Sequence, residues 1–156
     1  MAEPERETAA DGTSSDSAGR LLAIDLGAKR VGVAVCDELR ITVNPLPVIE
    51  RRSWKDFLRR IVALVETQDA RGLVIGLPLR LDGTEGDAAK DARSVANKFQ
   101  RSLDIPVYLQ DERLTTFEAA ANSKTARGAG EIHAALDSEA AALILRDFIV
   151  SKDKPI

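Results

Sequence analysis

Two apolar runs joined by a short turn near the N-terminus limit most strongly how this chain can fold. Residues 21–26 and 30–36 are mainly apolar, and the turn between them contains Gly27. Such a pair of runs around a short glycine-containing turn is typical of an antiparallel β-hairpin. The exception within the first run is Asp25, a carboxylate at the end of a strand that otherwise looks buried.

The rest of the chain alternates between strand-like and helix-like patterns. Residues 41–49 predict a third strand that is irregular or at a sheet edge, because Pro45 and Pro47 cannot donate ladder hydrogen bonds. Further strands are expected at 72–77 and 105–109, and helices at 53–68, at 86–102, from Thr115 and after Gly128 and Gly130. This order predicts an α/β fold with a five-stranded mixed sheet, an antiparallel meander followed by parallel strands, and helices on both faces.

Length and composition favour one folded domain. A chain of 156 residues, 44% of them hydrophobic, can bury a sizeable core. Residues 1–19 lack large apolar side chains and predict a disordered acidic tail, residues 20–150 the domain, and residues 151–156 a flexible C-terminus.

Charge and cysteine content narrow the class of protein. No apolar run approaches the roughly 20 residues that cross a bilayer, so no membrane partner is expected. The single cysteine, Cys36, allows no intrachain disulfide, which fits a reducing cytoplasm. The net charge is −3, but the first 19 residues carry −4 and the remainder +1, which neither supports nor excludes a nucleic-acid partner.

Acidic side chains occur at three places where strands or helices end or begin. Asp25 closes the first strand, Asp111 and Glu112 follow the strand at 105–109, and Asp137 lies near the start of the last helix. The carboxyl ends of parallel strands share one edge of a sheet, so these acids can meet there. A cluster of carboxylates is costly unless cations neutralise it, and oxygen-rich clusters hold Mg²⁺ or Mn²⁺. Two such ions stabilise the attacking and leaving oxygens in phosphodiester cleavage.

Each acid also has a purely structural explanation. Asp25 suits the start of a turn, and one member of the Asp111 and Glu112 pair can form an ion pair with Arg113. An acid near a helix N-terminus, as expected for Asp137, is favoured by the helix dipole. The spacing of the acids leaves both explanations open.

Five sequence blocks occur in order along residues 21–150: DLGAKRVGVAVCD, NPLPVI, VIGLPLRLDGTEG, DERLTTFEA and LDSEAAALIL. In these blocks the chain resembles the YqgF family, also called RuvX, of bacterial Holliday-junction-resolvase-like proteins that are regarded as pre-16S rRNA nucleases. The resemblance implies an RNase H-like fold and a nuclease site that uses a divalent metal ion.

The resemblance also implies roles for individual residues. By position in the blocks, Asp25, Glu112 and Asp137 are the expected catalytic residues and ligands of Mg²⁺ or Mn²⁺. Asp111 remains an alternative ligand, because neighbouring strand residues point to opposite faces.

Four basic residues are candidates for contact with a nucleic-acid backbone. Lys29 and Arg30 lie in the hairpin turn, Arg80 lies in the loop after the strand at 72–77, and Arg113 follows the acidic pair. Solvated turns and internal ion pairs explain these cations as well.

The leading interpretation is a metal-dependent endonuclease in the cytoplasm that cleaves structured RNA and, by resemblance, processes the 5′ end of pre-16S rRNA. A branched-DNA resolvase and a non-catalytic RNA-binding assembly factor are the alternatives, and the sequence sets no oligomeric state. The DLG hairpin also resembles the phosphate loop of actin-like ATPases and sugar kinases, but those need two such domains and the chain is too short for them.

Overall fold

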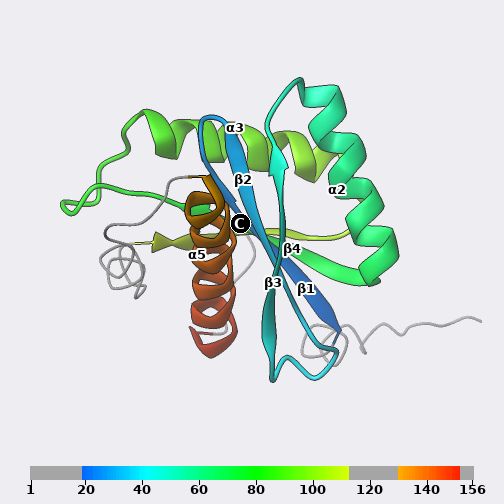
Figure 1. Ribbon diagram of the computed structural model, residues 1–156. Helices are drawn as coiled ribbons and strands as arrows, with labels where there is room; N and C mark the ends of the chain where they lie inside the picture. The colour runs from blue at the N-terminus through cyan, green and yellow to red at the C-terminus, as the bar shows by residue number, and fades with distance from the viewer. Residues whose placement is uncertain (1–18, 113–129, 152–156) are drawn as a thin grey trace, which may run out of the picture.

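The computed structural model describes residues 19–112 and 130–151, with side chains of the last helix from residue 136 onward (Figure 1). The elements are β1 (Arg20–Leu26), β2 (Arg30–Cys36), β3 (Val43–Glu50), α2 (Trp54–Gln68), β4 (Ala70–Leu77), α3 (Asp87–Ser102), β5 (Val107–Asp111) and α5 (Gly130–Ser151). The helix expected from Thr115 and most of both predicted terminal segments fall outside the described residues.

The strands form one five-stranded sheet in the order β3-β2-β1-β4-β5. Strand β2 pairs antiparallel with both β1 and β3, whereas β4 pairs parallel with β1 and β5. The predicted mixed sheet, with an antiparallel meander followed by parallel strands, is confirmed. Strand β3 lies at the edge and its register against β2 shifts between Val31 and Val33, as its two prolines predict.

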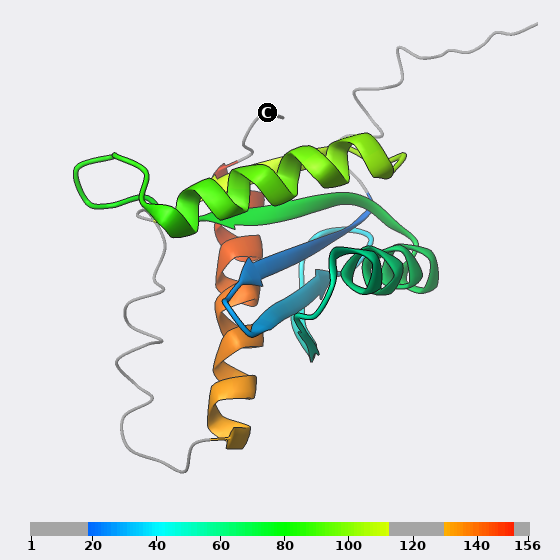
Figure 2. The ribbon, with the colours of Figure 1, turned by 90° about the horizontal axis from the view of Figure 1, so that it is seen from above.

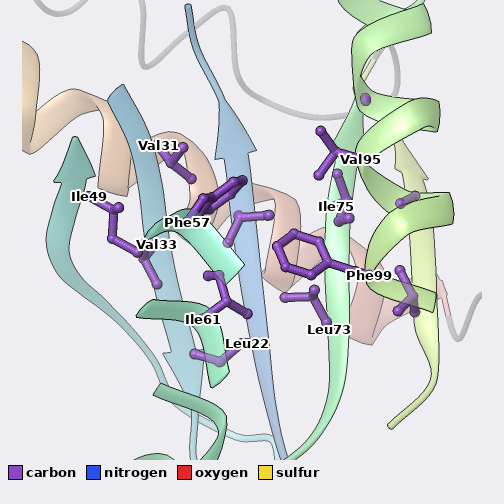
Figure 3. Packing of buried hydrophobic residues seen from close by; sticks show 14 of the residues in the cluster. Leu22, Val31, Val33, Ile49, Phe57, Ile61, Leu73, Ile75, Val95 and Phe99 are labelled. Atoms are coloured by element: carbon purple, nitrogen blue, oxygen red, sulfur yellow. The ribbon is translucent and has the colours of Figure 1, made fainter. Parts of the chain in front are cut away.

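Helices cover both faces of the sheet (Figure 2). Helices α2 and α3 pack on one face, where Phe57 and Ile61 of α2 and Val95 and Phe99 of α3 meet apolar strand residues (Figure 3). Helix α5 packs on the other face, against residues such as Ala23. Because side chains alternate along a strand, residues two apart share a face, and this alternation decides which side chains α5 can reach.

A local sequence signal explains where α2 begins. The Ser53 hydroxyl accepts a hydrogen bond from the backbone N–H of Asp56 at 3.1 Å, as expected for the cap of α2.

No helix within residues 19–112 and 130–151 is long and apolar enough to cross a membrane.

Several element boundaries differ from the sequence prediction by one or two residues, and two of these differences concern site residues. Strand β5 extends to Asp111 because its parallel pairing with β4 runs to the Leu77–Asp111 pair, a contact between distant segments. Helix α5 begins at Gly130 itself rather than after it, and glycine is tolerated at the start of a helix, where it costs less than in the interior. Asp137 is therefore the eighth residue of α5, and the prediction that it lies near the helix start, with the helix-dipole explanation, is wrong.

Candidate functional site

Asp25 and Glu112 meet on the face of the sheet that α5 covers. Leu21, Ala23 and Tyr108 pack in the hydrophobic cluster around α5. Because residues two apart on a strand share a face, Asp25 lies on the same face as Leu21 and Ala23, and Glu112 on the same face as Tyr108. The two carboxyl groups are hydrogen-bonded to each other. The topology thus joins a residue of the central strand β1 to one that directly follows β5, as the sequence analysis predicted.

Gly76 of β4 provides the space for this meeting. Strand β4 lies between β1 and β5, and a Cβ at Gly76 would overlap the Glu112 carboxylate and lie 2.6 Å from Cδ1 of Ile144. A side chain at this position would force the Glu112 carboxylate to shift from its place beside Asp25. Gly76 is not among the site residues expected from the sequence, although a glycine inside an apolar strand is a known sign of close approach by another group.

Burial makes both carboxyl groups hard to ionise. The pKa of Asp25 is raised to about 7, first by burial and then by the negative charge of Asp137, against the lowering effect of the hydrogen bond with Glu112. The pKa of Glu112 is raised to about 8 by burial, by the charge of Asp25, by the hydrogen bond to Asp25 and by the charge of Asp111. Two carboxyl groups bond directly only when one keeps a proton, so the Glu112 carboxyl donates to the Asp25 carboxylate.

Glu112 is the member of the acidic pair that bonds to Asp25. Asp111 is the last residue of β5 and alternates with Glu112, so its side chain belongs to the face of Val107 and Leu109. Its negative charge still raises the pKa of Glu112.

Asp137 lies near Asp25, but its carboxylate is engaged by Arg30. Its charge raises the pKa of Asp25, while Nε of Arg30 donates to Oδ2 of Asp137 at 2.9 Å. Both side chains of this ion pair are partly exposed, 38% for Arg30 and 33% for Asp137. Among the described residues, no group of three or more Asp, Glu, His or Cys side chains is arranged to hold a metal ion. The structure therefore brings the three expected acids into one neighbourhood without forming a complete coordination shell.

The turn between β1 and β2 carries Lys29 and Arg30 beside this neighbourhood. The N–H of Gly27 donates to the Arg30 carbonyl at 2.9 Å, and a Cβ at Gly27 would lie only 2.7 Å from that oxygen. Lys29 is exposed at the tip of the turn. The turn geometry thus demands glycine, and of its two cations Arg30 reaches Asp137 while Lys29 is exposed to solvent.

Arg51, which the sequence analysis did not select, holds this turn in place. Its backbone N–H donates to the Lys29 carbonyl at 2.8 Å, and Nη1 donates to the Gly27 carbonyl at 2.9 Å. The same guanidinium donates to both carboxylate oxygens of Asp91 on α3, at 2.8 and 2.9 Å. Arg51 therefore ties the turn to the helix on the opposite face.

Of the other two basic candidates, Arg80 and Arg113, the structure describes only Arg80. Arg80 is exposed, and it donates to the Thr84 hydroxyl at 3.3 Å within its own loop, whose turn at Gly83 has a φ of 90°. Arg113 lies outside the described residues.

A family model and curated relatives match this chain and agree with one another on its family. A family model described as RuvX, Holliday junction resolvase, matches residues 19–151. A protein of Syntrophus aciditrophicus (strain SB) named "Putative pre-16S rRNA nuclease" is 41% identical over 138 residues, which cover 86% of this chain and 92% of that protein. A protein of the same name from Synechococcus elongatus is 38% identical over 135 residues, covering 86% of this chain and 91% of its own.

Comparison with solved structures gives a likeness of fold. The structure of T. thermophilus RuvC in complex with a Holliday junction substrate superposes with a TM-score of 0.57 and 14% identity, over 88% of this chain and 99% of that chain. A structure of Thermus thermophilus RuvC superposes with a TM-score of 0.52 and 12% identity over the same shares.

Proposed function

Because the chain belongs to the RuvX family and has an RNase H-like fold, we propose that it is a metal-dependent endonuclease that cleaves structured RNA. The observation that carries this proposal is the hydrogen-bonded pair of Asp25 and Glu112, half-buried at the sheet edge with both pKa values raised by partial removal from water. Half-burying two acids with a third close by is unfavourable in a site that serves structure alone. Strongly shifted acids of this kind are typical of functional sites.

The donor set suits a divalent cation. Asp25, Glu112 and Asp137 would supply carboxylate oxygens, the ligands that Mg²⁺ and Mn²⁺ prefer, and a cation would offset the charge that burial penalises. We therefore propose Mg²⁺ or Mn²⁺ as the cofactor, with Asp111 as an alternative ligand. When bound, such an ion polarises the phosphodiester and lowers the pKa of water.

The protein side chains have distinct proposed tasks. Asp25 is anchored by the central strand and Glu112 by the end of β5, so both present their oxygens from rigid elements. Lys29 and Arg30 belong to the turn that follows the strand of Asp25, and we propose that they hold a backbone phosphate, with Arg80 and Arg113 as further candidates. For Arg30 this task requires exchanging the Asp137 carboxylate for a phosphate.

The names of the relatives suggest the substrate. Two of them are named for pre-16S rRNA, and we propose that this chain processes the 5′ end of the same kind of precursor, in the cytoplasm. Branched DNA is the second candidate, since the family is described as a Holliday junction resolvase and the similar RuvC structure holds a Holliday junction substrate.

Side-by-side cleavage tests the proposal. The full-length protein is incubated with a pre-16S rRNA fragment or a four-way DNA junction, in Mg²⁺, in Mn²⁺ or in EDTA. We expect metal-dependent cleavage of the RNA, reduced at least about a hundredfold by Asp25→Asn, because this change removes a negative ligand oxygen. The matched control is Asp69→Asn, an exposed acid in the left-handed conformation that asparagine also adopts, which should cleave as wild type does.

Three other outcomes of this experiment would contradict the proposal or favour one of the alternatives. Equal cleavage by wild type and Asp25→Asn would remove Asp25 from the mechanism. Cleavage of the junction but not the RNA would establish the resolvase. RNA binding without cleavage in either metal would favour the non-catalytic assembly factor.

A further inference from the structure

The part of α5 that carries Asp137 rests directly on the backbone of β2. A Cβ at Gly32 would overlap the carbonyl group of Asp137 and lie 2.9 Å from the backbone nitrogen of Ser138. Gly32 is also the register partner of Asp25 in the β1–β2 ladder. The helix therefore touches the sheet at the residue directly opposite Asp25, and only glycine leaves room for this contact.

The hydroxyl of Ser138 fastens the helix at the same place. Ser138 is 3% exposed, and its hydroxyl donates to the Leu46 carbonyl at 2.6 Å and accepts from the Val33 N–H at 3.3 Å. Val33 and Leu46 are partners in the β2–β3 ladder and lie next to its register shift. One side chain of α5 thus bridges two strands where the ladder is irregular.

These contacts differ in kind from the rest of the α5 interface. Among residues 136–151 the other fully buried side chains are apolar, and apolar contacts are non-directional, so they favour burial without selecting one rotation of the helix. Two other polar contacts of α5 with the sheet, Arg30 with Asp137 and Arg146 with the Val43 carbonyl, involve exposed or partly exposed side chains. Two hydrogen bonds through one hydroxyl are directional, and they set both the rotation and the height of the helix at Ser138. The adjacent Asp137 depends on that setting, because a rotation by one residue would turn it away from Asp25.

We propose that Ser138 and Gly32 are positioning residues, which hold Asp137 at the distance from Asp25 that metal binding requires. This inference rests on the proposed function, because it assigns Asp137 a task in the metal site. It adds two residues that contact neither metal nor substrate and act only through the backbone next to Asp137.

The experiment measures Mn²⁺ affinity, by the electron paramagnetic resonance of free Mn²⁺, and the kcat and KM of RNA cleavage in full-length variants. Ser138→Ala removes both hydrogen bonds. We expect about tenfold weaker Mn²⁺ binding and about tenfold lower kcat, with KM within about twofold, in line with the usual effect of removing a group that orients a ligand. Ser138→Cys, which keeps a weak donor and acceptor in nearly the same shape, should lie between Ala and wild type, and it serves if Ser138→Ala does not fold.

Two controls separate positioning from stability. Leu145→Val trims a buried side chain two turns further along α5 and should lower thermal stability while leaving Mn²⁺ affinity within about twofold of wild type. Ser151→Ala makes the same chemical change at the end of α5, where the hydroxyl donates to the Phe148 carbonyl at 3.1 Å, and should change neither Mn²⁺ affinity nor kcat.

The possible results are distinct. Wild-type Mn²⁺ affinity in Ser138→Ala, or an equal loss in Leu145→Val, would overturn the positioning role while leaving the nuclease intact. Absence of both Mn²⁺ binding and cleavage in wild type would overturn the proposed function, and the positioning role with it.

Discussion

The two faces of the sheet differ in the side chains that separate the helices from the strands. Toward α2 and α3 the core contains large rings, with Phe57 and Phe99 buried and their centroids 5.2 Å apart. Toward α5 one ring pair, Tyr108 and Phe148, is present as well, but alanines face each other across the interface, Ala23 and Ala34 on the strands and Ala141 on the helix. Large side chains hold helices away from a sheet, whereas small ones let a helix backbone come close. The difference suggests that one face mainly supplies stability, while the other brings acids from three segments together.

The largest expected effect comes from the face of large rings. Phe99→Ala should lower the free energy of unfolding by about 3–5 kcal/mol, because it leaves a cavity beside Trp54 and Phe57, whose rings lie 4.9 and 5.2 Å away. Urea denaturation measures this loss. Cleavage per folded molecule should stay within about twofold of wild type. A much larger fall would contradict the inference that this face mainly supplies stability.

On the face that α5 covers, a substitution should affect cleavage more than stability. Gly76→Ala should cost about 2 kcal/mol of unfolding free energy through overpacking and lower RNA cleavage at least about tenfold, because the new methyl group displaces Glu112. The control is Gly72→Ala in the same strand, whose Cβ would lie 2.8 Å from Cδ2 of Leu21 and 3.1 Å from Cε2 of Tyr108. This control should lose similar stability and keep its cleavage rate. Equal cleavage by the two variants would remove Gly76 from the site.

The pH dependence of stability sharpens the comparison without any change in packing. In the folded protein the pKa of Asp25 is raised to about 7 and that of Glu112 to about 8. At pH values between the ordinary carboxyl pKa and these raised values, the folded state therefore binds more protons than the unfolded state. The unfolding free energy of the metal-free protein should therefore fall as pH rises through these values, by on the order of 2 kcal/mol. Urea denaturation in EDTA across this range measures it.

Two further arms of the same experiment isolate the acids. Asp25→Asn should flatten the fall, since it removes one of the two coupled carboxyl groups. Excess Mn²⁺ should stabilise the wild type increasingly as pH rises, because it binds the ionised form. A wild-type protein whose stability rises over this range would show that the acids are not buried as described.

The smallest expected effect concerns the link between the two faces. Arg51→Lys should cost about 1 kcal/mol of unfolding free energy and lower cleavage about threefold, because lysine cannot hold Asp91 with two nitrogens and also reach the Gly27 carbonyl. Arg52→Lys is the matched control, since Arg52 is exposed and donates to Glu50 at the surface. If both variants behave alike, the turn does not depend on Arg51.

Much of the fold was predictable because its signals are local. The hairpin follows from two apolar runs around Gly27, the edge position of β3 follows from Pro45 and Pro47, and the start of α2 follows from Ser53. These patterns depend on residues close in sequence and on the alternation of strand side chains, so distant contacts barely alter them.

The site was predictable in its acids but not in their support. The expectation that Asp25, Glu112 and Asp137 converge agrees with their mutual electrostatic effects in the structure. Their roles in catalysis and metal binding stay predictions. The residues that make room for the acids or anchor their surroundings, Gly32, Gly76, Arg51 and Ser138, were not singled out by sequence reasoning, because each acts on a segment far away in sequence.

By itself, the sequence determined the order of strands and helices, the edge strand and the acids available for chemistry, because local geometry and hydrophobic periodicity suffice for these. Only the tertiary structure decided that Glu112 rather than Asp111 bonds to Asp25, that Asp137 lies inside a helix and pairs with Arg30, and that α5 touches β2 at Gly32. The physical reason is that register and close packing are collective, since each depends on pairs of residues that meet only once the sheet has formed.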